Sequence, residues 1–265
     1  MNQPNPRLLP QRIIRAANVL KLATAYAAIA VFAITFNVAS AADVPEQIKA
    51  MLASPDRSQA DRDADARRHP AELLAFAEVR TGMSVLDMGT GGGYTAELLA
   101  RAVTPKGRVI AQNDPVVFEK FLKSTVPARF ATPVMGNVQH VVRPTDDPLP
   151  AGAGPLDLVI IAYFYHDTVW LNRDRPKMNK TILDALKPGG MLVIVDHAGN
   201  PGTGITQTQS VHRIEESVVR SELAAAGFEF VADAGFLRNP DDPRDTPFFK
   251  ATIPVDGFVL KFRKP

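Results

Sequence analysis

The sequence of 265 residues contains no cysteine. Disulfide bonds and thiolate metal sites both require cysteine, so the chain has neither. Its fold must therefore be held together by its hydrophobic core. The lack of a free thiol also suits an exported protein, in which such a group would be a liability.

Clusters of positive charge are equally scarce. The chain has 30 Lys and Arg against 28 Asp and Glu, and four of the basic residues lie in the first 41 residues, which contain no acid. The rest of the chain therefore carries 26 basic and 28 acidic side chains. Because a nucleic-acid footprint needs clustered Lys and Arg, we expect no nucleic-acid partner.

The first 41 residues have the pattern of a secretory signal peptide. Basic residues precede an apolar run over Leu22–Phe36, and Ala39-Ser40-Ala41 is a small-x-small cleavage site. Cleavage near Ala41/Ala42 would make the protein periplasmic or secreted. The alternative is an uncleaved membrane anchor, because Leu22–Ala39 spans 18 residues and about 20 residues cross a bilayer.

The remaining composition fits one α/β domain with extensions, since 46% of the residues are apolar and 22% are charged. Residues 42–80 are predicted to form a helical extension. Within it, Asp56–Arg68 carries many charges of mixed sign, which is typical of a solvated helix face. A second interpretation is a lid over a cofactor pocket. Residues 81–265 then form the main domain.

Apolar strand patterns alternate with helical patterns through residues 81–265. This alternation predicts a doubly wound parallel sheet with helices on both faces. The segment His197–Val211 interrupts it with glycines, proline and no periodicity, and loops of this length are usually functional or disordered. The predicted strands end at or near 86, 111, 142, 161, 195, 232 and 262.

The first strand runs into a glycine cluster and then a helix that begins at Tyr94. Glycine is needed at such a turn because it adopts unusual φ and ψ and lets a ligand approach the backbone. The dinucleotide-binding pattern G-x-G-x-x-G would require a small residue at position 94, where this chain has tyrosine. The sequence therefore argues against a dinucleotide-binding turn.

The pattern that does fit has an acidic residue two positions before G-x-G-x-G, met by Asp87, Gly89, Gly91 and Gly93. It resembles motif I of the class I S-adenosylmethionine-dependent methyltransferases. The resemblance implies that this loop, with Thr90 and Tyr94, holds the methionine part of S-adenosyl-L-methionine, and that Asp87 orients its amino end. The alternative is a glycine-rich turn without a ligand.

Acidic and amide side chains follow the next two strands. Asp114 lies 21 residues past Gly93 and is a candidate to accept hydrogen bonds from the ribose hydroxyls, a role that Asn113 could share. The alternative for Asp114 is an N-cap before Pro115. Asp146, in the loop after the third strand, is a weaker candidate to contact the adenine amine.

The C-terminal part of the chain extends the resemblance to a family of bacterial exported proteins that are predicted methyltransferases. The likeness covers residues 57–265 and implies the seven-stranded methyltransferase sheet, with an antiparallel last strand, but no substrate. Thr246–Asp256 departs from the pattern expected for the family, so the resemblance does not predict the structure of that edge of the pocket. The matching segments are Val195–Ala198, Pro201–Gly204, His212–Ile214, Ala225–Phe228, Leu237–Pro240 and Phe258–Pro265.

Three of the five histidines follow strand ends where ligands of open α/β sheets bind: His166, His197 and His212. Methyl transfer to an oxygen or nitrogen acceptor releases a proton, and histidine is a suitable base near neutral pH. We predict that His197 and His212 face the acceptor. The alternative is that each histidine is a hydrogen-bonded structural residue.

Two more groups join the predicted acceptor site. Asp196 and Arg213 are candidates to hold the base or the substrate. Tyr163 is a candidate to face the sulfonium through a cation–π contact, although aromatic residues at a strand end are more often core.

The favoured function is an S-adenosylmethionine-dependent methyltransferase acting on a small molecule. The objection is compartment, because the cofactor is made in the cytoplasm and the chain has an export signal. A second hypothesis is an exported binding protein that retains the fold without catalysis. A third is a metal-dependent enzyme that uses His166, His197 and His212 with a carboxylate. Because their spacing matches no local metal motif, no metal ligand is assigned. The oligomeric state stays open.

Overall fold

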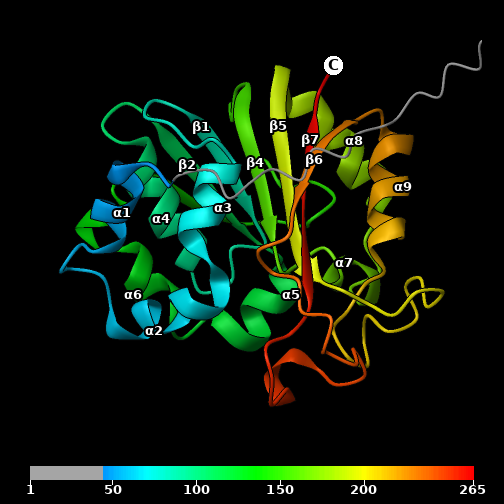
Figure 1. The fold of residues 1–265 in the computed structure, drawn as a ribbon. Helices are drawn as coiled ribbons and strands as arrows, with labels where there is room; N and C mark the ends of the chain where they lie inside the picture. Colours follow the sequence, from blue (N-terminus) through cyan, green and yellow to red (C-terminus); the bar gives the residue numbers. More distant parts are fainter. Residues whose placement is uncertain (1–43) are drawn as a thin grey trace, which may run out of the picture. The chain divides into compact units, whose positions relative to one another are not determined.

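A computed structural model describes residues 44–265 (Figure 1). The predicted signal peptide and its cleavage site lie outside the described residues. Within residues 44–265, no helix has the length and apolar character needed to cross a bilayer.

A seven-stranded sheet forms the centre of the described part, in the order β3-β2-β1-β4-β5-β7-β6. The first five of these strands are parallel, whereas β7 runs antiparallel to both β5 and β6. The predicted doubly wound sheet with an antiparallel last strand is thus confirmed. The strands are β1 Ser84–Met88, β2 Arg108–Asn113, β3 Val138–Val142, β4 Leu156–Ala162, β5 Leu186–His197, β6 Glu229–Ala234 and β7 Gly257–Arg263.

Helices cover both faces of the sheet (Figure 1). Side chains alternate across a strand, so Val85 and Leu86 of β1 point into different core clusters. The Val85 cluster includes residues of α1, α3 and α4, and the Leu86 cluster includes residues of α8 and α9. Those helices are α1 Glu46–Leu52, α3 Pro70–Phe76, α4 Tyr94–Val103, α8 Arg175–Ala185 and α9 Glu216–Ala226.

Short helical turns fill several connections and were mostly not predicted. Proline opens three of the turns between β2 and β3, and each is too short to show helical periodicity in the sequence. The short elements are α2 Gln59–Arg68, α5 Pro115–Val117, the π-turn η1 Phe118–Leu122, α6 Val126–Phe130, η2 Pro133–Met135, α7 Asp167–Trp170 and η3 Phe248–Lys250.

Strand β5 is longer than predicted because it begins at Leu186 rather than near Met191. The intervening Pro188-Gly189-Gly190 was interpreted as a turn. In the structure, the Gly189 amide donates to the Lys264 carbonyl and the Lys264 amide donates to the Gly190 carbonyl. Backbone bonds to the end of the chain therefore hold this glycine-rich segment in the sheet. The carboxyl end of β5 lies beside that of β4, where the candidate site is found.

Candidate functional site

The glycine loop between β1 and α4 is packed at both ends, against Phe164 at Gly89 and against Phe130 at Gly93, and is open in the middle. Gly89, Gly91 and Gly93 all have positive φ, at 70°, 56° and 85°. A Cβ added at Gly89 would lie 2.2 Å from the Phe164 ring, so packing alone requires glycine there. At Gly91 an added Cβ would meet nothing within 4 Å. The middle of the loop is therefore where a ligand can reach the backbone.

Asp87 lies at the base of this loop and is almost fully buried. Its carboxylate accepts a hydrogen bond of 2.6 Å from the Thr90 hydroxyl. Burial raises the pKa of Asp87 to about 6, although the Thr90 hydrogen bond and the positive charge of Arg68 act in the opposite direction. A buried carboxylate of this kind gains from any cation that reaches it.

The end of β2 contacts the loop through Asn113 rather than Asp114. The Asn113 side chain accepts from the Gly91 amide at 3.0 Å and donates to the Gly91 carbonyl at 3.2 Å. Asp114 is fully buried, caps α5 through the Val116 amide, and pairs with Arg173 at 2.7 Å. The structure thus gives Asp114 the capping role that was its alternative, one residue beyond the position that touches the loop.

Asp146 lies half-buried in the turn after β3, an edge strand of the sheet. The neighbouring Asp147 accepts a hydrogen bond from Arg143 instead. Contact of Asp146 with the adenine amine stays a prediction.

Helix α2 is joined to α4 by a hydrogen bond and to α6 by an ion pair rather than standing free in solvent. The Tyr94 hydroxyl donates to Asp65 at 2.6 Å, and Arg57 donates two hydrogen bonds of 2.7 Å to the same carboxylate. Asp61 pairs with Arg129 at 2.7 Å. The mixed-charge run is therefore docked against α4 and α6, and its opening as a lid stays a prediction.

Arg68, at the end of α2, was not singled out from the sequence. Its guanidinium lies 4.7 Å from the centroid of the Tyr94 ring and 5.3 Å from that of Tyr163. Within the described residues it forms no salt bridge, and burial lowers its pKa while the arginine stays charged. No local sequence signal separates it from its charged neighbours, because only the fold brings the two tyrosines to it.

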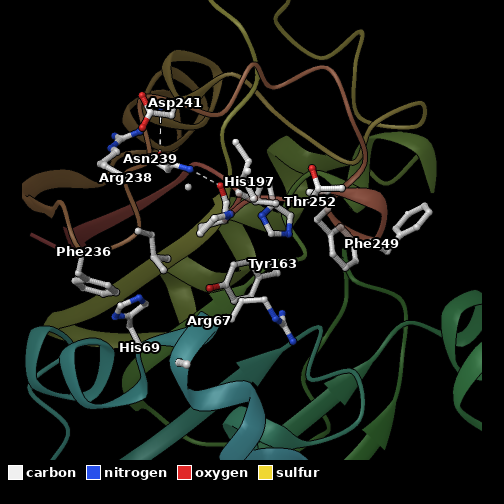
Figure 2. Close-up of a pocket in the computed structure, with 18 residues that line it drawn as sticks. Arg67, His69, Tyr163, His197, Phe236, Arg238, Asn239, Asp241, Phe249 and Thr252 are labelled. Carbon is white, nitrogen blue, oxygen red and sulfur yellow. Dashed lines mark hydrogen bonds between the residues drawn. The ribbon is translucent and has the colours of Figure 1, made fainter.

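Tyr163 lines a cavity of about 1020 Å³ (Figure 2). Tyr163 and His197, from the ends of β4 and β5, lie side by side with ring centroids 4.9 Å apart. Tyr163 has a φ of 58°, a backbone strain that often marks functional sites. The cavity is also lined by residues of α2, the α2–α3 junction and the β6–β7 connection, among them Arg67, His69, Phe236, Arg238, Asn239, Asp241, Phe248, Phe249 and Thr252.

His197 is held as a neutral ring at the cavity wall. Burial and then the charge of His166 lower the pKa of His197 well below its usual value. The Phe248 ring stacks on it at a centroid distance of 4.9 Å. This aromatic part of the pocket belongs to Thr246–Asp256, the segment whose contribution was open at the level of sequence.

The other two predicted histidines meet behind this wall. His166 contacts Asp196 through Nδ1 at 2.6 Å and Asp167 through Nε2 at 3.0 Å. His212 Nδ1 lies 3.3 Å from both His166 Nε2 and Asp167 Oδ1. Burial opposes the charged form of His166, but the charges of Asp196 and Asp167 outweigh it and raise its pKa to about 10.

Arg213 does not face the cavity. It is fully buried, pairs with Asp242 at 2.8 Å, and donates to the carbonyls of Ala198 and Thr246. Its guanidinium joins the β5–α9 loop to the β6–β7 connection. The hypothesis that Arg213 holds the base or the substrate is therefore replaced by a structural role.

Comparisons with known proteins agree with this geometry. A family model described as protein-L-isoaspartate(D-aspartate) O-methyltransferase matches residues 25–119. The chain is 31% identical over 122 residues to the protein-L-isoaspartate O-methyltransferase of Aeropyrum pernix, an alignment that covers 46% of this chain and 42% of that protein. It is 30% identical over 188 residues to the catechol O-methyltransferase of Mycobacterium tuberculosis, covering 63% of this chain and 83% of that protein.

A solved structure titled as a SAM dependent methyltransferase from Aquifex aeolicus shares the fold, with a TM-score of 0.56 at 19% identity over 83% of this chain and 98% of that chain. The chain belongs to the S-adenosylmethionine-dependent methyltransferases, a family whose cofactor is S-adenosyl-L-methionine. It spans about half the length of the protein-L-isoaspartate O-methyltransferases that it matches.

Proposed function

We propose that the protein transfers a methyl group from S-adenosylmethionine to a hydroxyl or amine of a small aromatic molecule. The observation that supports this most directly is the position of Tyr163. Its ring centroid lies 5.3 Å from the guanidinium of Arg68, and Tyr163 lines the cavity beside His197. A donor at the loop and an acceptor in the cavity would meet at this ring.

The residues at the loop fit the methionine end of the cofactor, which carries one ammonium and one carboxylate. Asp87 offers a buried carboxylate for the ammonium. Arg68 offers a guanidinium that the described residues leave without a salt bridge. The two side chains are close enough for each to influence the other's pKa. Gly91 has open space beside it, so the ligand can approach the protein backbone there.

The cavity favours a flat acceptor. Phe248 and Phe249 stand at right angles to each other with ring centroids 5.2 Å apart, and Phe248 stacks on His197. Aromatic ligands gain from such offset and edge contacts. Arg67 also lines the cavity and can pair with an anionic group on the acceptor, whereas Arg238 is paired with Glu216. A volume of about 1020 Å³ is sufficient for a small molecule beside the cofactor.

His197 is the proposed proton acceptor. The sulfonium of the bound cofactor would supply an electrophilic methyl group, to which the acceptor's oxygen or nitrogen bonds in line while the carbon–sulfur bond breaks and S-adenosylhomocysteine leaves. The acceptor's proton then passes to a ring nitrogen of His197. Because its pKa lies well below its usual value, His197 is neutral at pH 7 and available to accept that proton.

Release of S-adenosylhomocysteine tests the proposed function. The purified protein is incubated with S-adenosylmethionine and a panel of phenols, catechols and aromatic amines, and the product is measured by mass spectrometry. We expect turnover with at least one member of the panel. The His197→Gln variant should lower turnover by about 10²- to 10⁴-fold, while its affinity for S-adenosylhomocysteine stays unchanged because His197 does not touch the loop.

The possible outcomes separate the hypotheses. Full turnover in His197→Gln would exclude its role as the base. Tight binding of S-adenosylhomocysteine without turnover on any acceptor would favour a binding protein that retains the fold. Absence of cofactor binding would overturn the proposed function.

We also propose that the protein works outside the cytoplasm, on the basis of its N-terminal sequence. The intact mass of protein recovered from the periplasm should correspond to a chain that begins at Ala42. A mass that includes residues 1–41 would replace cleavage with anchoring.

A further inference from the structure

Three side chains outside the proposed acceptor pocket converge at one point. His166 and Asp167 follow β4, and His212 returns to them from the loop between β5 and α9. The pairwise distances among His166 Nε2, His212 Nδ1 and Asp167 Oδ1 are 3.0, 3.3 and 3.3 Å. No local sequence motif marks this group, because 45 residues separate Asp167 from His212.

We propose that His166, Asp167 and His212 bind one divalent transition-metal ion, with Zn²⁺ the best match. Two imidazole nitrogens and one carboxylate oxygen are a common ligand set for Zn²⁺ and Fe²⁺. Ligands about 2.1 Å from an ion are separated by about 3.0 Å in octahedral and about 3.4 Å in tetrahedral geometry. The three observed distances fall within this range.

Hydrogen bonding alone explains the triangle less well than a shared ion. A proton can link two of the three atoms along one N–H direction, whereas a cation accepts lone pairs from all three at once. His212 is also held at a φ of 54°, a strained backbone for histidine, to bring its ring to this point. Its side chain keeps 28% exposure, so an ion can enter from solvent.

The surroundings of the three ligands match those of a metal centre. His166 directs its second nitrogen to the fully buried Asp196 at 2.6 Å, an arrangement that fixes ring orientation in metal sites. The Trp170 indole donates to Asp167 Oδ1 at 2.6 Å and orients that carboxylate. His197 stands apart, with its ring centroid 6.1 Å from that of His166. The site therefore differs from the hypothesis that included all three histidines.

An ion at this position would fasten the β5–α9 loop to the end of β4. His212 also contacts Phe248 and Phe249, with ring centroids at 6.1 and 5.7 Å. The metal would thus stabilise the aromatic wall of the cavity from behind. This inference does not rest on methyl transfer, because binding of the metal alone is its readout.

Cobalt titration tests the site. The purified full chain is stripped with a chelator and titrated with Co²⁺, whose visible d–d absorption reports coordination, and Zn²⁺ is then added as competitor. We expect one equivalent of Co²⁺ per chain, displaced by one equivalent of Zn²⁺. The near-isosteric His212→Asn and Asp167→Asn should each weaken binding by at least about 100-fold.

The matched control is His69→Asn. His69 also has a positive φ, at 48°, which asparagine tolerates, and it lies outside the triangle. Binding should be unchanged in this variant. The proposal is overturned by the absence of stoichiometric Co²⁺ absorption, by unchanged affinity in both ligand variants, or by an equal loss in His69→Asn.

X-ray absorption of the Zn²⁺-loaded wild-type chain keeps the test independent of how the variants fold. Two imidazole ligands and a carboxylate are expected around the ion. A shell without imidazole would also overturn the site.

Discussion

The proposed cofactor side and the proposed acceptor side of this site are built in different ways. On the cofactor side, Asp87 to Gly93 form one continuous turn at the end of a central strand. The acceptor cavity instead draws its residues from α2, the ends of β4 and β5, and the β6–β7 connection. Chemistry carried by a continuous turn can be recognised from its local pattern, whereas a cavity assembled from distant segments depends on the whole fold.

The two sides also differ in whether their charged groups are already paired within the protein. Gly91 is held by Asn113, and Asp87 by Thr90, yet Asp87 and Arg68 retain charges that suit a zwitterionic ligand. Around the cavity, Arg213 is fully satisfied by Asp242 and two carbonyls. Charge on the first side is available for binding, and charge on the second side holds the walls together.

Arg213→Met gives the largest expected effect and tests the structural role of the second side. Removing one partner of a buried ion pair leaves Asp242 uncompensated, so the free energy of unfolding should fall by about 3–5 kcal/mol. Urea denaturation measures it. The exposed pair of Arg263 with Glu229 gives a control, because Arg263→Met should change stability by less than about 1 kcal/mol. Small and equal losses of stability in Arg213→Met and Arg263→Met would contradict the structural role of Arg213.

Gly89→Ala and Gly91→Ala separate packing from ligand access within the loop. Alanine at Gly89 adds about 1–3 kcal/mol of overpacking against Phe164 to about 1–2 kcal/mol for positive φ. Only the second cost applies at Gly91. Urea denaturation should therefore show the greater loss at Gly89. A greater loss at Gly91 would mean that the loop is packed differently.

Asp87→Asn is expected to lower the affinity for S-adenosylhomocysteine by about tenfold or more. Loss of a charge-assisted hydrogen bond costs about 1.5–3 kcal/mol of binding free energy. Because the pKa of Asp87 is raised to about 6, a bound ammonium must drive proton release below that pH. Wild-type affinity should therefore fall as pH drops through about 6, and the variant should lose this slope. Calorimetry between pH 5 and 8 measures both.

The contribution of Asp87 to the stability of the fold should change with pH in the direction opposite to its contribution to cofactor affinity. The folded pKa of Asp87 lies above its unfolded value of 3.8, so its contribution to stability is full below about 3.8 and is lost as pH rises through about 6. Asp147→Asn, an exposed aspartate paired with Arg143, is the control and should leave cofactor affinity unchanged. A pH slope that survives in Asp87→Asn would assign it to another group.

The sequence predicted the order of strands and helices because apolar periodicity and glycine turns are local signals. It also placed Asp87 and the glycines at the turn. It named Asn113 and Asp114 together as candidates for the ribose hydroxyls, and that contact stays a prediction; the structure shows Asp114 capping α5. Asn113 is the side chain that reaches the loop.

Contacts across long separations could not be predicted in the same way. Arg68 gains its position only when α2 docks beside Tyr94 and Tyr163. Arg213 was placed among the site residues because it follows His212, yet its side chain turns to Asp242. Neighbours in sequence here serve different purposes, which only the fold determines.

Calorimetric titration with S-adenosylhomocysteine tests the central claim, that the cofactor lies between Asp87 and Arg68. The account predicts one molecule bound per chain, and an affinity lower by about tenfold or more in Arg68→Met, which removes a charge-assisted contact. Arg62→Met, on the same helix but bonded to Gln59 and the Arg57 carbonyl, should bind as the wild type does. No binding by the wild-type chain, or equal affinity in Arg68→Met, would contradict it.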